Sequence, residues 1–298
     1  MLEILETAPP DAILGLTEAF KKDTDPGKVN LGVGVFKDAN NNTPVLASVK
    51  AAEARILEAE TTKGYHPIPG APAYTGAVQE MLFGPGHEII ADNRAATAHT
   101  PGGTGALRVA GDFIKKHFPN ASIWLSDPTW ANHPAIFKAA GMPIKTYPYY
   151  NQAGKTLDFD KMMAAIAEIP AGDIVLFHGC CHNPSGMDPD AEQWAAIAAE
   201  VRKQGLLPLI DFAYQGFADG IEEDAAGLRA FCTPGDELLI CSSFSKNFGL
   251  YRERCGALTL VAKDGEACER AFSNLKITIR TNYSNPPSHG GEIVATIL

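Results

Sequence analysis

Lys246 is a reactive side chain at an unexpected position, because it follows the apolar, strand-like run ELLICSSF. An unpaired ammonium is costly to bury, so a lysine at the inner end of such a run needs a purpose. It could clamp a phosphate, form half of an ion pair, or act as a nucleophile whose pKa is lowered by desolvation and nearby cations. Arg254 stands eight residues further on and could supply such a cation.

Three other polar segments also follow apolar runs. In TPGGTGAL, glycines before Thr104 leave backbone N–H groups free to bind an anion, although the segment matches neither a P-loop nor the dinucleotide-binding glycine pattern. Asp211 ends LLPLID, where a buried carboxylate needs a cation or several donors. Asn183, in FHGCCHNPSG, offers an amide. The ordinary explanations would be a tight turn with a threonine N-cap, an aspartate helix cap and a turn asparagine.

One ligand would satisfy all of these segments. Its ring nitrogen would be kept protonated by Asp211, its ring oxygen would accept hydrogen bonds from Asn183 and Tyr214, and its aldehyde would form a Schiff base with Lys246. Its phosphate would be bound by Gly103, Thr104, Ser243 and Arg254. Pyridoxal 5′-phosphate has each of these groups, and the ring nitrogen paired with a carboxylate makes it an electron sink.

The segment HGCCH at 178–182 raises the alternative of a metal site, since His178, Cys180 and His182 would share one side of an extended segment. No second ligand pair at zinc spacing occurs elsewhere, so core packing and hydrogen bonding are the preferred interpretation and we expect no metal. The 6 cysteines mostly stand in apolar runs without C-x-x-C spacing, which is typical of reduced core thiols.

The elements that must position these residues alternate between strand-like and helix-like from about residue 86 onwards. The apolar spacing predicts helices over 104–118, 130–141, 158–169 and 191–205. Short β-rich runs predict strands over 122–127, 144–150, 173–179 and 206–211. This order indicates an α/β fold with a mostly parallel central sheet covered by helices on both faces, in which ligands bind at the carboxyl ends of the strands.

The first 43 residues break this alternation. We interpret 1–43, which includes KVNLGVGVF, as an N-terminal arm and part of a small domain, with the turn DANNNTP as the boundary to a large cofactor-binding domain over 44–298. The last segment, SHGGEIVATIL, has the pattern of the opening of an apolar helix. We therefore expect the remainder of a C-terminal small domain to be missing from these 298 residues.

Charge and composition exclude several classes of function. The chain has 298 residues and a net charge of −10 without a Lys/Arg block, which argues against nucleic acid or an anionic membrane as a partner. No run approaches 18 apolar residues, and the start has the character of neither a secretory signal nor a transit peptide. We expect a cytoplasmic protein.

The segments TPGGTGALR, DPTWANH, FHGCCHNPSG, DFAYQGF, SFSKNFGLYRER and IRTNYSNPPSHG resemble the aspartate aminotransferase family, subgroup I of the fold-type I pyridoxal-phosphate enzymes. The resemblance runs from near residue 10 to the last residue and includes the spacing between the motifs. It is greatest to the bacterial members that also accept aromatic amino acids. It implies the fold-type I architecture, pyridoxal 5′-phosphate, a cytoplasmic location in bacteria, and a homodimer with shared active sites.

The resemblance also implies roles that spacing alone does not show. Trp130 would stack on the cofactor ring, His133 would support Asp211, and both Trp130 and Asn183 would contact the substrate. Gly34 would lie beside the bound substrate. Tyr65 would reach the phosphate of the other subunit, and Arg280 would bind the distal carboxylate of the substrate across the dimer. The ordinary alternatives are core aromatic residues, an interior histidine, a turn glycine and a surface arginine.

The activity that this resemblance implies is ping-pong transfer of the amino group between L-aspartate and 2-oxoglutarate, giving oxaloacetate and L-glutamate. Lys246 would move the α-proton, and Asp211 and Tyr214 would be the other catalytic residues. The family's arginine for the α-carboxylate lies in the C-terminal lobe, beyond residue 298. Two alternatives therefore stay open: an aromatic-amino-acid aminotransferase, and a catalytically incompetent cofactor-binding fragment. A decarboxylase or lyase is disfavoured, because Arg280 and NYSNPP would lack a purpose.

Overall fold

The computed structural model describes residues 1–7, 15–29, 32 and 34–298. Contacts divide the chain into two compact units, Met1–Pro44 and Val45–Leu298. The first contains the 3₁₀-helix η1 (Leu2–Ile4) and helix α1 (Gly15–Lys22). Residues 30–31 and 33 of the segment KVNLGVGVF lie outside the described residues. The assignment of 1–43 to an arm and part of a small domain, and of 44–298 to a large domain, stays a prediction.

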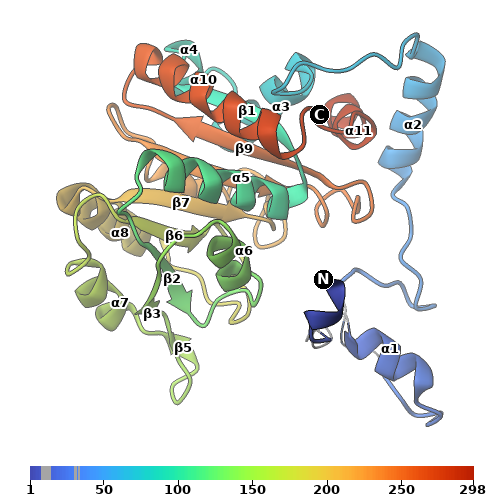
Figure 1. Ribbon diagram of the computed structural model, residues 1–298, viewed down its shortest axis with the longest axis horizontal. Coiled ribbons are helices and arrows are strands. Elements are labelled where there is room, and N and C mark those ends of the chain that lie inside the picture. The colour runs from blue at the N-terminus through green and yellow to red at the C-terminus, as the bar shows by residue number, and fades with distance from the viewer. Residues whose placement is uncertain (8–14, 30–31, 33) are drawn as a thin grey trace. The chain divides into compact units, whose positions relative to one another are not determined.

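The unit Val45–Leu298 is built on a seven-stranded sheet with the order β1-β9-β8-β7-β6-β2-β3 (Figure 1). Its strands are β1 (Ala95–Pro101), β2 (Ile123–Asp127), β3 (Ile144–Pro148), β6 (Ile174–His178), β7 (Leu207–Phe212), β8 (Leu238–Ser243) and β9 (Cys255–Val261). The short strands β4 (Tyr150–Asn151) and β5 (Thr156–Leu157) form a separate hairpin. Neighbouring strands of the large sheet are parallel except for β9, which runs antiparallel to β1 and β8. The predicted α/β class with a mostly parallel sheet is confirmed.

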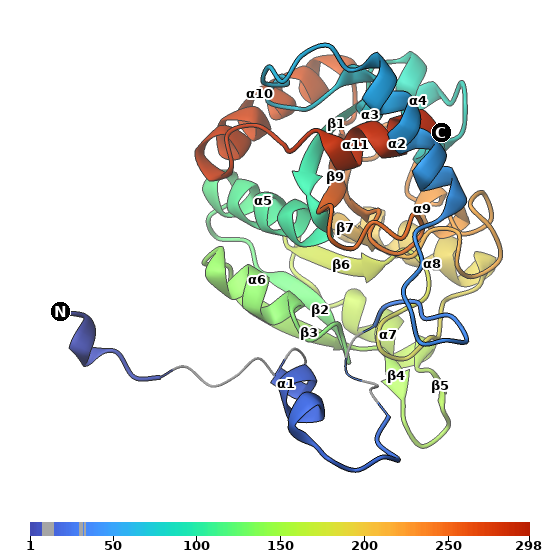
Figure 2. The same cartoon turned by 90° about the vertical axis from the view of Figure 1, so that its right-hand side faces the viewer.

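Helices cover both faces of this sheet (Figure 2). One face packs against α5 (Gly102–His117), α6 (His133–Ala139) and α10 (Gly265–Asn282). The other packs against α2 (Ala47–Ala59), α3 (Pro72–Phe83), α7 (Phe159–Ile166), α8 (Ala191–Gln204), α9 (Ala226–Arg229) and α11 (His289–Ile297). A further short helix, α4 (Glu88–Ala91), precedes β1. Each face has its own cluster of buried apolar side chains, so the sheet separates two hydrophobic cores.

The central strands are apolar at nearly every position because both of their faces are buried. In β6, Ile174 and Leu176 belong to the core under α5 and α6, whereas Val175 and Phe177 belong to the core on the opposite face. This alternation follows from the period of two of an extended strand. It also fixes which face the polar residues at the strand ends point to, and that decides the composition of the site.

Local sequence explains where the helices begin. Helix α8 starts with a capping box between Asp190 and Gln193 and ends at Gly205, whose φ of 65° is left-handed. The helix predicted over 130–141 begins only at His133, because Trp130–Asn132 form a turn and Pro134 occupies the first turn. Proline is favoured there, since its missing N–H would have no partner in the helix.

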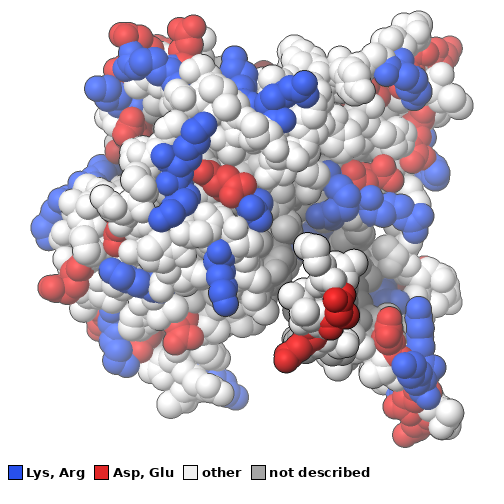
Figure 3. Space-filling view, in the orientation of Figure 1, with Lys and Arg blue, Asp and Glu red and all other residues white. Residues whose placement is uncertain are grey.

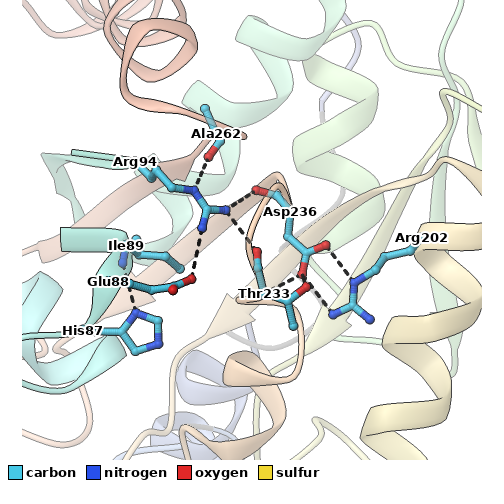
Figure 4. Close-up of polar contacts among 8 residues, drawn as sticks. All are labelled: His87, Glu88, Ile89, Arg94, Arg202, Thr233, Asp236 and Ala262. Atoms are coloured by element: carbon cyan, nitrogen blue, oxygen red, sulfur yellow. Dashed lines mark hydrogen bonds and ion pairs between the residues drawn. The ribbon is translucent and has the colours of Figure 1, made fainter. Parts of the chain in front are cut away.

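Arg94 forms hydrogen bonds that connect several segments at the end of the sheet where the parallel strands begin (Figure 4). Its side chain is buried, and it donates to the backbone carbonyls of Ala262 at 3.0 Å, Thr233 at 3.1 Å and Asp236 at 3.0 Å. The Asp236 carboxylate in turn accepts from Arg202 at 2.7 and 2.9 Å. These bonds join the start of β1, the end of β9 and the loop before β8. This is the edge away from the candidate site.

The surface carries both signs of charge. In the view of Figure 3, Lys and Arg side chains are interspersed with Asp and Glu over the visible face. None of the described helices combines the length and the apolar run that crossing a bilayer requires.

Candidate active site

The strand register brings the predicted residues to one edge of the sheet. Asp211 pairs with His178 on β6 and with Cys241 on β8, so these three lie in one row across the strands. Because β9 is antiparallel, its first residue, Cys255, pairs with Pro101 at the end of β1. Arg254, which precedes β9, therefore lies at the same edge as the residues that follow the parallel strands.

Two glycines shape the space at the start of α5. Gly102 has a φ of +75°, and a Cβ there would collide with the Arg254 guanidinium. A Cβ on Gly103 would lie 2.9 Å from the Cβ of Ser243, which is buried. The N-cap residue is Pro101, so the alternative of Thr104 as a helix cap is wrong. The two glycines thus bring the backbone at the start of α5 close to the Ser243 side chain and the Arg254 guanidinium. Helix-start amides, hydroxyls and guanidinium groups are all able to bind a phosphate.

Asp211 is a strand residue with a buried carboxylate, 8% exposed. The alternative of a helix cap is wrong, because β7 is followed by a turn. Its Oδ2 accepts a hydrogen bond of 3.0 Å from Nε2 of His133, which is fully buried on α6. Burial alone would raise the pKa of Asp211, but the bond from His133 and the nearby His178 and Lys246 hold it below its usual value. The carboxylate is therefore ionised at neutral pH.

A chain of hydrogen bonds sets the orientation of His133. The backbone N–H of Asn183 donates to Nδ1 of His178 at 3.3 Å, so the proton of that imidazole is on Nε2 and points to Thr129 Oγ1, 3.2 Å away. The Thr129 hydroxyl can then donate to Nδ1 of His133 at 2.8 Å. This arrangement leaves the His133 proton on Nε2, facing Asp211. Burial supports it, because it lowers the pKa of His178 to about 4 and keeps that ring neutral.

The residues of the metal alternative are held by other contacts. His182 makes hydrogen bonds of 3.0 Å to Ser126 and 2.7 Å to Ser185 and stacks on Tyr149 with ring centres 3.8 Å apart. Cys180 is buried in the core, and the six cysteines are free. In the part of the chain that the structure describes, no group of three or more His, Cys, Asp or Glu side chains could hold a metal ion.

Lys246, Tyr214 and Asn183 converge above Asp211. Lys246 lies in the turn after β8, half-buried, with Nζ 4.8 Å from the centre of the Tyr214 ring. The Tyr214 hydroxyl is hydrogen-bonded to the side chain of Asn183. Burial, assisted by the Arg254 guanidinium and opposed by Asp211, lowers the pKa of Lys246 below its ordinary value. This environment makes the neutral amine more accessible than for an exposed lysine, and the neutral amine is the state that a nucleophile or base requires.

The remaining predicted residues differ in their placement. The Trp130 ring lies edge-on to His133 with centres 5.2 Å apart, so it belongs to the same cluster. Tyr65 is 94% exposed, and Arg280 is exposed near the end of α10, where it bonds to Ser284. Neither contacts the described residues around Lys246. Gly34 belongs to the other unit, Met1–Pro44, so its role stays a prediction.

Sequence reasoning missed Thr129, the link between His178 and His133. The available signal was its position four residues before His133 within the segment DPTWANH. A threonine next to a strand end is too common to stand out without the register that brings His178 beside it.

Comparison with known proteins identifies the family. The family model of class I and II aminotransferases matches residues 26–298. The chain belongs to this family. An aspartate aminotransferase of Salmonella typhi is 56% identical over 298 residues, which cover 100% of this chain and 75% of that protein. An aromatic-amino-acid aminotransferase of Pseudomonas aeruginosa is 49% identical over 290 residues, covering 97% of this chain and 72% of that protein.

A solved structure of the family agrees with the fold. An aromatic-amino-acid aminotransferase from Burkholderia pseudomallei, described as covalently bound to pyridoxal phosphate, matches with a TM-score of 0.96 and 46% identity. The match covers 99% of this chain and 74% of that one. The resemblance and the fold-type I class predicted from the motifs are therefore confirmed, and pyridoxal 5′-phosphate is the cofactor of this aminotransferase family.

Proposed function

We propose that the protein transfers the amino group between L-aspartate and 2-oxoglutarate in two half-reactions, with pyridoxal 5′-phosphate as cofactor. The observation that carries the proposal is the convergence of three groups at one sheet edge. These are the Lys246 amine with its lowered pKa, the Tyr214 hydroxyl, and the ionised Asp211 carboxylate backed by His133. Relatives named aspartate aminotransferase, at 45–56% identity, support the choice of substrate.

The residues present fit this cofactor. Gly102 and Gly103 let the Arg254 guanidinium and Ser243 approach the backbone at the start of α5, because a Cβ on either glycine would collide with them. The phosphate would be held by Gly103, Thr104, Ser243 and Arg254, with Tyr65 contributed to the site of a second subunit. Asp211 would pair with the ring nitrogen, Asn183 and Tyr214 would bond the ring oxygen, and Trp130 would cover the ring face. Lys246 would supply the amine for covalent attachment.

When bound, the cofactor supplies an electron sink next to the substrate α-carbon. Asp211 would supply a negative charge to the ring nitrogen, and His133 holds that carboxylate in place through its Nε2 proton. Lys246 would take the α-proton as a neutral amine, and its lowered pKa makes that form more accessible than for an exposed lysine. The Tyr214 ring, with its centre 4.8 Å from Nζ of Lys246, would orient that amine, and its hydroxyl would bond the ring oxygen of the cofactor.

Substrate selection would use residues from both subunits of a homodimer. Arg280 would bind the distal carboxylate in the neighbouring subunit, while Gly34, Trp130 and Asn183 would line the substrate space. The protein is expected in the cytoplasm. The aromatic-amino-acid aminotransferase among the relatives, at 49% identity, keeps aromatic substrates as a second candidate. A ratio of kcat/KM values for aspartate and phenylalanine separates the two.

Substitution of Asp211 tests the proposal. Asp211→Ala should lower kcat far more than it weakens cofactor binding, with a loss of about 3–5 kcal/mol if this pair resembles other buried charge pairs. Asp211→Glu keeps the charge and should lose less. The measurements are kcat and the cofactor dissociation constant. A loss in kcat below about tenfold, roughly 1.4 kcal/mol, would make Asp211 a purely structural residue.

A further inference from the structure

The loop that carries Tyr214 is folded around a buried carboxylate that the proposed chemistry does not use. This loop, residues 213–225, connects β7 to α9 and contains the short segment YQGFADG. Among its acidic residues, Asp224, ten positions after Tyr214, is buried, with 6% of its surface exposed. A buried carboxylate is costly unless its oxygens are fully bonded, so its partners show what it does.

All the partners of Asp224 are backbone N–H groups of its own loop. Oδ2 accepts from Gly216 at 2.8 Å and Ala218 at 3.1 Å, and Oδ1 accepts from Asp219 at 2.9 Å and Gly220 at 3.3 Å. Burial alone would raise the pKa of Asp224, but these four bonds lower it below its ordinary value. An ionised carboxylate is acceptor-only and can satisfy four donors, which no neutral side chain of this size can do.

The same loop is tied to the turn that carries Lys246. Gln215, 1% exposed, donates from Nε2 to the carbonyls of Met81 and Ile221, both at 2.9 Å. Asn247, which directly follows Lys246, donates from Nδ2 to the Gln215 carbonyl at 3.2 Å. The backbone of Tyr214 is closed into a turn by the N–H of Phe217 at 3.0 Å. The residue next to Tyr214 and the residue next to Lys246 are therefore bonded to each other.

We propose that Asp224 is a positioning residue for Tyr214, acting through the backbone of residues 216–220. Its carboxylate binds these amides within one turn. That turn fixes the direction of the backbone at Tyr214, where the chain leaves β7. The Tyr214 ring is thereby held under the Lys246 amine and its hydroxyl beside Asn183. The inference rests on the proposed function only for the use that catalysis makes of Tyr214.

Asp236 provides a matched control at the opposite edge of the sheet. It is partly buried, with its side chain 11% exposed. Its carboxylate also accepts from a loop amide, that of Thr233 at 2.8 Å, and its pKa is also lowered by hydrogen bonds that outweigh its burial. Its partners include Arg202 and Arg94 (Figure 4), and Arg94 lies where β1 begins and β9 ends, whereas Lys246 follows the end of β8. Replacing Asp236 thus removes the same kind of loop carboxylate without touching Tyr214.

The test compares Asp224→Asn with Asp236→Asn. An asparagine turns an NH₂ group towards two backbone donors, so amides 216–220 should exchange hydrogen at least about tenfold faster in the cofactor-free Asp224→Asn protein. In the loaded enzyme, kcat/KM for aspartate should fall about ten- to hundredfold, the effect of a displaced catalytic group. Asp236→Asn should lower the melting temperature but leave kcat/KM and the exchange of 216–220 unchanged.

The double variant Asp224→Asn/Tyr214→Phe decides between positioning and general stability. If Asp224 acts through Tyr214, the kcat/KM of the double variant should be about that of the less active single variant, because the two losses are not additive. Multiplied losses, or unchanged kcat/KM despite faster exchange, would overturn the proposal. Asp224→Glu keeps the acceptor oxygens, so its amides 216–220 should exchange hydrogen more slowly than those of Asp224→Asn. The glutamate variant replaces Asp224→Asn in the test if the asparagine variant does not fold. A wild-type protein without aminotransferase activity would contradict the proposed function, while the exchange result would still report on the loop.

Discussion

The Nζ atom of Lys246 lies over the face of the Tyr214 ring, 4.8 Å from its centre. The two residues come from loops that follow neighbouring strands, β8 and β7, and the bond between Asn247 and Gln215 joins those loops. An ammonium over an aromatic face gains about 0.5–2 kcal/mol, more where water is excluded. This gain offsets only part of the cost of burying Lys246, since the net effect of the site is to lower its pKa.

The lowered pKa of Lys246 predicts a pH dependence of stability in the cofactor-free protein. Between the folded pKa and the unfolded value of about 10.4, the unfolded chain binds more protons at this position, so stability from this group rises with pH in that window and is lowest below it. Lys246→Met removes the charge and keeps an unbranched side chain. We expect the variant to be more stable than the wild type at pH 7, with a difference that shrinks towards pH 10.

Urea denaturation of both cofactor-free proteins, at one protein concentration and several pH values, measures this difference. Other titrating groups are common to the two proteins and cancel. A methionine variant that is less stable than the wild type at pH 7 would show that the charge of Lys246 does not destabilise the folded protein.

Arg280→Leu tests substrate selection. A guanidinium binds a carboxylate through two parallel hydrogen bonds, and loss of one partner of such a desolvated pair costs about 2–5 kcal/mol. In active protein, kcat/KM for aspartate and glutamate should therefore fall about thirtyfold to several thousandfold, since each 1.4 kcal/mol is tenfold. Phenylalanine has no side-chain carboxylate, so its kcat/KM should change little. Equal losses for aspartate and phenylalanine would make Arg280 a structural residue.

Mixed subunits test whether Arg280 serves the neighbouring site. A protomer with Lys246→Ala is expected to lack turnover, and one with Arg280→Leu to lack aspartate selectivity. In a heterodimer of the two, one site would receive an intact lysine and an intact arginine. Mixing should therefore restore part of the aspartate activity, and no recovery in verified heterodimers would contradict a shared site.

Thr129→Val removes the link between two histidines. It leaves Nδ1 of His133 and Nε2 of His178 without the hydroxyl that both contact, at a cost of about 1–3 kcal/mol for a buried unsatisfied group. We expect that loss in denaturation experiments, together with a shift of the His133 Nε2 proton in NMR spectra. Thr129→Ser keeps the hydroxyl and should change neither by much. An unshifted His133 proton in the valine variant would show that Asp211 alone fixes the ring.

The fold and the site differ in how much of them the sequence could predict. The alternation of apolar runs was sufficient for the α/β class, because parallel strands buried on two faces are apolar throughout and stand out between helices. Lys246, Asp211 and Asn183 could be singled out since each follows such a run. The ends of elements were less accurate: Pro134 delays α6, and Pro148 closes β3 before Tyr150, so the ranges 130–141 and 144–150 were too long.

Residues that act through the backbone were beyond sequence reasoning. Asp224 stands among other acidic residues in GIEEDA, and only the folded loop shows that its oxygens face four amides. Thr129 and His178 are 49 positions apart and meet only through the parallel pairing of β2 and β6. The sequence patterns therefore single out candidate ligand-binding groups, whereas the groups that hold those candidates in place depend on register.

The place of β1 in the sheet has a consequence for synthesis of the chain on the ribosome. β1 is the first strand to be made, yet its partner β9 is the last, with Pro101 opposite Cys255. Roughly 150 residues must emerge in between, which takes on the order of ten seconds at 5–20 residues per second. During that time β1 lacks its partner strand, and Gly102 has no Arg254 to approach. The strand that carries Asp211 is thus synthesised before the segment that brings Arg254 to Gly102, and β1 stays without its partner until β9 has been made.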